Sequence, residues 1–193
     1  MELQQQLADF RAFLQATFAA VDAWFDQPAA FLDYVPADQG WSGSEILTHI
    51  GLTNHYLLIL IEKGTAKALH NSRGQDLATE LAAQPLNPAR LASIGVLHAF
   101  AWLRPAHMEP RAFPKPLPLV RQQLREQLTQ ALACLDRLPT GQGVLCQTTM
   151  TVNSLGKLNV YEYLYFLAQH AQRHVRQLAE NAAELAAEPG LEK

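Results

Sequence analysis

Apolar residues recur every three or four positions in four separate stretches of the chain, which is the spacing of one buried face on an α-helix. The first stretch covers residues 2–25, and the second covers residues 42–63, with Gly64 placed to cap its C-terminal end. The third covers residues 119–138, and the fourth runs from Asn159 to about residue 185. We therefore predict four long helices that bury their apolar faces against one another, an all-α bundle.

Two of these helices begin with a recognisable capping signal. Ser42 is followed three residues later by Glu45, and Asn159 is followed at the same distance by Glu162. This spacing is typical of a capping box, in which each side chain binds a backbone N–H group of the other residue.

A long insertion, residues 65–117, separates the second predicted helix from the third. Short helices are predicted over residues 77–84 and 88–102, and the proline-rich stretch 104–118 is predicted to be irregular. A crossover of this length allows the second and third helices to run parallel instead of antiparallel. Only residues 144–152 are expected to be extended.

Composition and charge narrow the classes of function. The length of 193 residues fits one domain, 1–193, and a net charge of −3 argues against a nucleic-acid partner. The longest apolar run, 56–61, is too short to cross a membrane, and no secretory signal opens the chain. Cys134 and Cys146 have neither metal-site nor disulfide spacing. We expect a cytoplasmic protein with reduced, buried thiols and no membrane partner.

Helical wheels place three of the seven histidines at the borders of apolar stripes. His170 and His174 lie one turn apart on the fourth helix, beside a side predicted to face solvent that holds Arg173, Arg176, Glu180 and Glu162. His49 lies at the edge of the second helix's stripe, which comprises Ile46, Ile50, Thr53, Leu57 and Leu60. His55 faces solvent. Histidines one turn apart can share one metal ion, but three separately hydrogen-bonded imidazoles explain the same pattern.

Two motifs resemble those of the DinB-like superfamily, a group of metal-binding four-helix bundles. "GWSGSEILTHI", residues 40–50, resembles the start of that family's second helix. "LGKLNVYEYLYFLAQHAQRHVRQL", residues 155–178, resembles its last-helix signature. "WLRPAHMEP", residues 102–110, is similar to a segment in a subset of these proteins. The resemblance extends in order from Trp41 to Leu178.

The resemblance implies a metal site, with His49, His170 and His174 as its ligands. The expected ion is divalent, with nickel or zinc first and manganese or iron as further candidates. The family also has a long crossover between its second and third helices, and a homodimer is expected from the resemblance alone. Some relatives are thiol-dependent S-transferases, which implies a low-molecular-weight thiol as a partner.

Structural zinc sites are usually closed by four protein ligands. Three histidine ligands fall one short of that number, so at least one coordination position is left open. An open position can bind water or a thiol, so the sequence predicts a transferase or hydrolase that acts on a small-molecule substrate. Candidate catalytic residues are Glu45, as a general base, and Tyr163, as a hydrogen-bond donor. Gln177 is a candidate for orienting a ligand, and His107 is a candidate for reaching the cleft from the insertion. A non-catalytic metal-binding or stress-response protein and a purely structural scaffold remain as alternatives.

Overall fold

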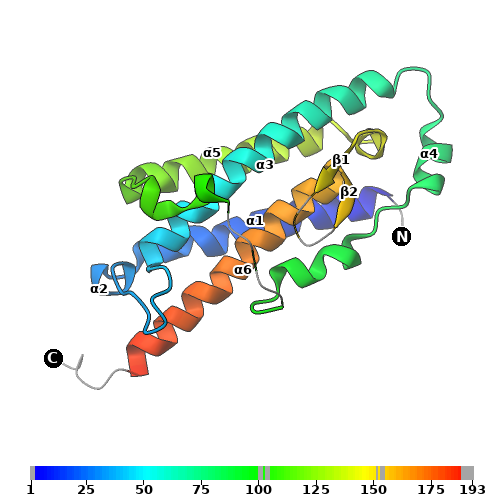
Figure 1. Ribbon diagram of the computed structural model, residues 1–193. Coiled ribbons are helices and arrows are strands. Elements are labelled where there is room, and N and C mark those ends of the chain that lie inside the picture. The colour runs from blue at the N-terminus through cyan, green and yellow to red at the C-terminus, as the bar shows by residue number, and fades with distance from the viewer. Residues whose placement is uncertain (1–2, 100–101, 103–104, 151, 153–154, 188–193) are drawn as a thin grey trace.

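Four long helices dominate the computed structural model, which describes residues 3–99, 102, 105–150, 152 and 155–187 (Figure 1). They are α1 (Leu3–Ala23), α3 (Gly43–Asn71), α5 (Leu117–Asp136) and α6 (Val160–Ala187). Each corresponds to one predicted helix, and the prediction of an all-helical bundle is confirmed. The connection between α1 and α3 contains the 3₁₀ turn η1 (Trp24–Asp26) and the single-turn helix α2 (Ala29–Leu32).

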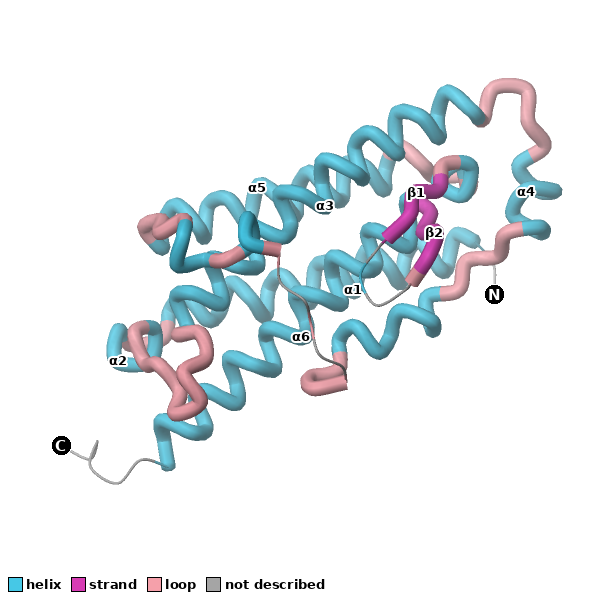
Figure 2. The backbone as a smooth tube through the Cα atoms, in the orientation of Figure 1, coloured by secondary structure: helices cyan, strands magenta, loops and turns pink. Residues whose placement is uncertain are grey.

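The helices α3 and α5 run parallel. From the middle of α5, the Gln127 side-chain amide donates to the Gly51 carbonyl in the first half of α3 at 2.9 Å. Further along both, Arg137 donates to Glu62 at 3.1 Å. Residue numbers rise together along the two helices, so the crossover has to return the chain to the end at which α3 began, as Figure 2 shows. This is the arrangement that the length of the insertion allows.

Helix α3 is longer than its sequence pattern predicts. Gly64 does not end the helix, which continues to Asn71 and takes up the first part of the predicted insertion. The glycine serves a different purpose, since a Cβ atom at this position would lie only 3.1 Å from Cγ2 of Val160 at the start of α6. The absence of a side chain therefore lets the two helices approach closely.

The crossover contains short helices that pack along the bundle. It is built from α4 (Leu77–Ala83) and the 3₁₀ segments η2 (Pro88–Gly95), η3 (Ala106–Met108) and η4 (Pro110–Ala112). The helix predicted over 88–102 is thus a 3₁₀ segment that ends at Gly95, and residues 100–101 lie outside the described residues. Leu91 and Ile94 are fully buried, and the Arg176 side chain donates to the Gly95 carbonyl, so η2 is attached to α6.

A small hairpin leads into α6. After the 3₁₀ turn η5 (Gln142–Leu145), strand β1 (Gln147–Met150) pairs antiparallel with β2 (Gly156–Asn159). The first strand confirms the middle of the extended segment predicted over 144–152, but residues 144–145 belong to η5, and the partner strand was not predicted. Both capping boxes are present. Ser42 and Glu45 exchange hydrogen bonds at the start of α3, and Asn159 and Glu162 do so at the start of α6.

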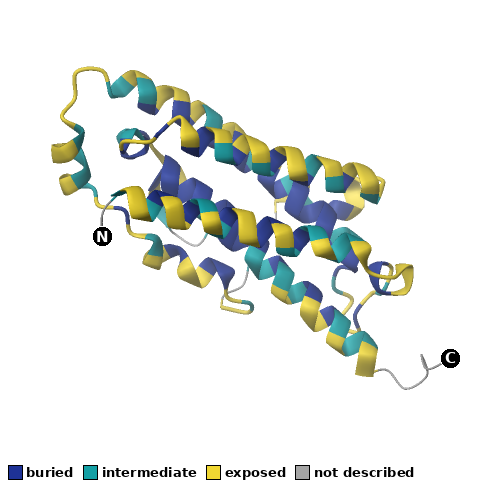
Figure 3. Ribbon diagram, turned by 180° about the vertical axis from the view of Figure 1, so that it is seen from behind, coloured by how far each residue is buried: buried dark blue, intermediate teal, exposed yellow. Residues whose placement is uncertain are grey.

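The apolar faces of the four long helices form a common core, while exposed residues follow their outer faces (Figure 3). Two side chains depart from the predicted faces. Leu60 is 40% exposed instead of lying in the core. Glu162 is buried instead of facing solvent, and Arg90 of the crossover pairs with it at 2.9 Å. The two cysteines are buried and free, as predicted. None of the described helices combines the length and apolar character needed to span a bilayer.

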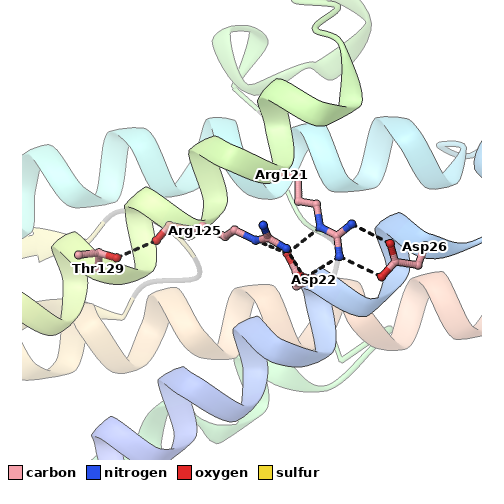
Figure 4. Close-up of polar contacts among 5 residues, drawn as sticks. All are labelled: Asp22, Asp26, Arg121, Arg125 and Thr129. Atoms are coloured by element: carbon pink, nitrogen blue, oxygen red, sulfur yellow. Dashed lines mark hydrogen bonds and ion pairs between the residues drawn. The ribbon is translucent and has the colours of Figure 1, made fainter.

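A charged network joins the end of α1 to the start of α5 (Figure 4). Arg121 binds both Asp22 and Asp26 at 2.7 Å, and Arg125 also binds Asp22, at 2.9 Å. Thr129, one turn further along α5, donates from its hydroxyl group to the Arg125 carbonyl. Hydrogen bonds from Arg121 and then Arg125 hold the pKa of Asp22 well below its ordinary value, so this carboxylate is ionised at neutral pH.

Candidate metal centre

Three buried histidines from two helices meet at one point in the bundle. The capping box at Ser42 fixes the start of α3, and His49 lies two turns into the helix. His170 and His174 lie on successive turns of α6. The ring centroids are 4.6 Å apart for His170 and His174, 4.8 Å for His49 and His174, and 5.3 Å for His49 and His170. One ring nitrogen from each residue lies within 4.8 Å of the other two.

Hydrogen bonds from the backbone and from Gln177 orient two of the rings. His49 donates from Nδ1 to the Met108 carbonyl at 2.8 Å, and His174 donates from Nδ1 to Oε1 of Gln177 at the same distance. Because Nδ1 carries the proton in each ring, Nε2 keeps its lone pair. Protein histidines that bind a metal are commonly held in this way, with the second nitrogen bonded outside the coordination sphere.

The spacing of the donor atoms suits a single cation. Nε2 of His170 and Nε2 of His174 are 3.2 Å apart. Two nitrogens bound to one metal at about 2.0–2.1 Å are separated by roughly 2.9–3.4 Å in octahedral or tetrahedral geometry. The other ring nitrogen of His170, Nδ1, is buried without a hydrogen-bond partner among the described residues. The pair on α6 therefore has the spacing of two ligands of one metal ion, and His49 lies close enough to be a third candidate ligand.

Burial keeps His170 and His174 neutral. His49, His170 and His174 are only 5%, 4% and 1% exposed. Desolvation lowers the pKa of His170 and of His174 well below the ordinary value, and the neighbouring histidines lower both further. A neutral imidazole is the form that binds metals, so the environment selects the ligand state before any ion arrives.

The cluster lies at the wall of a cavity of about 590 Å³. Most of the wall is apolar or aromatic, and its members include Trp41, Tyr56, Leu57, Trp102, Met108, Met150 and Phe166. Polar groups are fewer, and among them are Asp38, His98, His107, Arg173 and Gln177. The exposed Leu60 belongs to the same wall. An apolar cavity with a few convergent polar groups is typical of a small-molecule site.

The part of the crossover that includes η3 and η4 is tied to α3 beside the cluster. Trp41 donates from its indole N–H to Glu109 at 3.0 Å, and its ring lies 4.4 Å from that of His49. Arg111 binds the Glu45 carboxylate at 2.7 Å and the Gly40 carbonyl at 2.8 Å. These ties, which we call the crossover clamp, hold the Met108 carbonyl against His49.

Neither predicted catalytic residue is among the described residues that line the cavity. The Glu45 carboxylate accepts from the Ser42 N–H group and from Arg111. Burial alone would raise the pKa of Glu45, but the Arg111 and Ser42 hydrogen bonds outweigh it, and the pKa is lowered. The Tyr163 hydroxyl is directed to the Thr148 carbonyl at 3.4 Å, and burial raises its pKa. Both catalytic roles remain predictions.

The structure also places residues in the site that the helical wheels missed. Arg173 was assigned to the solvent side of the last helix, yet it lines the cavity with its guanidinium 5.1 Å from the ring centre of Trp102. A wheel cannot reveal this because the covering residue comes from the crossover. His107 reaches the cavity as its sequence position suggested, and Gln177 orients His174.

Comparison with known proteins places this fold and site in a family. No curated protein and no solved structure matches the chain. A sequence model described as the DinB superfamily matches residues 2–178, which is nearly the whole of the described bundle. The buried three-histidine cluster lies on the two helices whose motifs resemble that family. The chain belongs to the DinB superfamily.

Proposed function

We propose that this protein binds one divalent metal ion, nickel or zinc, through His49, His170 and His174 and uses it as an enzyme of the thiol-dependent transferase or hydrolase type. The observation that carries the proposal is the group of three buried imidazoles with their ring nitrogens within 4.8 Å, at the wall of a cavity that can admit a small molecule. Imidazole nitrogen suits nickel and zinc.

The chemistry follows from an incomplete set of protein ligands. Among the described residues, the group of candidate ligands has three members. When bound, a divalent cation would supply a Lewis acid with positions open to water or to a thiol, and would lower the pKa of either. The protein's own part is to orient the imidazoles through Met108 and Gln177 and to surround the reacting groups with apolar walls. His107 adds a further imidazole to the cavity wall.

Metal content is the first test, because one variant pair separates a specific site from incidental binding. We expect protein purified without a metal-affinity tag to carry about one nickel or zinc ion per chain. The variant H49A should lose this ion. H55A, which removes an exposed histidine from the same helix, should retain it. Equal metal content in the two variants, or none in the wild type after incubation with either ion, would contradict the proposal.

Turnover is the second test. A panel of low-molecular-weight thiols is incubated with monochlorobimane, so that the sulfur displaces chloride, a C–S bond replaces the C–Cl bond, and the thiol proton passes to the solvent. We expect at least one thiol to react faster with metal-loaded wild type and H55A than with H49A. Hydrolysis of ester and amide substrates is screened with the same variants.

The cavity also favours a second candidate function, non-catalytic binding of a small molecule by the metal-loaded protein. The described lining offers a single carboxylate that could take part in acid–base catalysis, Asp38, and it is exposed at the loop before Trp41. A ligand that binds saturably only to metal-loaded protein and is recovered unchanged would support this function and exclude turnover of that ligand.

A further inference from the structure

Arg173 brings a positive charge into the cavity beside the histidines. On a helix with 3.6 residues per turn, it lies about 60° around the axis from His170. Its side chain is partly buried, and its guanidinium stacks on Trp102, whose ring centre is 6.1 Å from that of His170. The cation is therefore held within the cavity close to the proposed metal.

Besides Arg173, the described lining holds one side chain with a formal charge, Asp38. Asp38 is exposed, and its carboxylate accepts the Gly40 N–H at 2.8 Å. His98 lies 3.2 Å from Glu180, which is outside the lining. Arg173 and Asp38 balance formally, so a divalent ion leaves the cavity with an excess of two positive charges. Apolar walls strengthen the attraction of a negative ligand to this excess.

We propose that the cavity binds a small organic acid, a molecule with an apolar body and a carboxylate that pairs with Arg173. The inference rests on the proposed function, of which it names the substrate class. The guanidinium fork matches a carboxylate with two parallel hydrogen bonds, and its stacking on Trp102 holds it in place before the ligand arrives. The body of the ligand lies against Leu57, Met150 and Phe166.

A matched pair of probes tests the proposal. Binding of 3-phenylpropionate and of its neutral amide, 3-phenylpropanamide, is measured by calorimetry with metal-loaded and metal-free wild type. We expect the acid to bind at least tenfold more tightly than the amide in both forms. R173Q should reduce this preference to less than threefold. R73Q, which removes an exposed arginine at the end of α3, should leave it unchanged.

The other possible outcomes distinguish the proposed carboxylate binding by Arg173 from the proposed metal binding by the histidines. A preference that survives R173Q and disappears when the metal is removed means that the carboxylate binds the ion, which overturns the proposal. Equal binding of the two probes, or no binding of either at 10 mM, overturns it as well. If His49 proves not to bind metal but R173Q abolishes the preference in metal-free protein, the proposal stands and the metal-dependent function fails.

A structure of the wild type with 3-phenylpropionate gives a readout that needs no variant. The carboxylate should lie within about 3.2 Å of the Arg173 guanidinium nitrogens, with the phenyl ring among the apolar walls. R173K keeps the charge but removes the fork, so it should keep part of the preference. A carboxylate bound outside hydrogen-bond reach of Arg173 would overturn the proposal even if the R173Q variant fails to fold.

Discussion

His174 depends on a single side-chain acceptor for its orientation. Its Nδ1–H group donates to Gln177, one turn further along α6, at 2.8 Å. We expect Q177A to weaken metal binding by roughly 10- to 100-fold, as is typical when the outer partner of a metal-bound histidine is lost. Competition with a chelating dye measures the change. Q130A, on the outer face of α5, serves as a control and should leave the affinity as it is.

The two interior glycines of α3 should respond oppositely to alanine. A Cβ atom at Gly51 would lie 3.5 Å from the Gln123 amide, which is ordinary contact, so G51A should stabilise the protein by about 0.5–1 kcal/mol through helix propensity. At Gly64 the same atom would press on Val160 at 3.1 Å, so G64A should gain nothing or lose stability. Urea denaturation compares the two variants, and an equal gain in both would contradict the close packing of α3 on α6.

At the scale of elements, the charged network between α1 and α5 should make stability depend on pH. The pKa of Asp22 is lower in the folded protein than in the unfolded chain, so its contribution is complete above the ordinary pKa near 3.8. This contribution is lost as the pH falls from there through the folded value. We expect D22N to cost about 1 kcal/mol at pH 7.

Urea denaturation of wild type and D22N at several pH values measures this effect. The other carboxylates contribute to both proteins alike, so the difference in unfolding free energy between wild type and D22N reports Asp22 alone. This difference should shrink steadily below about pH 4. A difference that stays constant down to pH 2 would show that the ion pairs of Asp22 add no stability.

Loosening the crossover clamp should weaken metal binding by the three histidines. R111Q removes the ion pair to Glu45 but leaves the Ser42–Glu45 capping box intact. We expect metal affinity to fall roughly threefold to tenfold, less than for a direct partner of a histidine, because Met108 is held less firmly against His49. Limited proteolysis should cut residues 105–113 sooner in R111Q than in R73Q. Unchanged affinity together with unchanged proteolysis would contradict a positioning role for the clamp.

The periodicity of apolar residues could predict the helices because each buries one stripe against the same core. The periodicity could not predict where α3 ends. Judged from its neighbours in sequence, Gly64 is placed as a C-terminal cap, but it packs against Val160, which belongs to a distant element. The position of Arg173 was missed for the same reason, since Trp102 of the crossover covers it. Helical wheels placed each of the three histidines at the border of a stripe, but only the family resemblance predicted that the three belong to one cluster. Gln177, the partner of His174, was a candidate for orienting a ligand, whereas Met108, the partner of His49, could not be predicted because it belongs to an irregular segment.

At the scale of the whole molecule, the three-histidine cluster joins α3 to α6 and is contacted by Met108 of the crossover, so binding of the proposed metal should stabilise the folded chain. A free metal concentration of 100 times the Kd adds about 2.7 kcal/mol. For a domain of this size, that corresponds to a rise in Tm of roughly 5–11 °C. Calorimetry with and without zinc should show the rise in wild type and H55A but not in H49A. A rise of the same size in H49A would place the stabilising ion elsewhere.

The distance along the chain between His49 and the pair on α6 has a consequence for biosynthesis. A ribosome releases His49 long before it has made His170 and His174, so for most of its translation a nascent chain holds only one of the three imidazoles of the cluster. The proposed ion can be captured only after α6 has docked beside α3. We therefore expect metal loading to follow the synthesis of α6, and messages truncated before the codon for His170 should yield products that carry no tightly bound nickel or zinc.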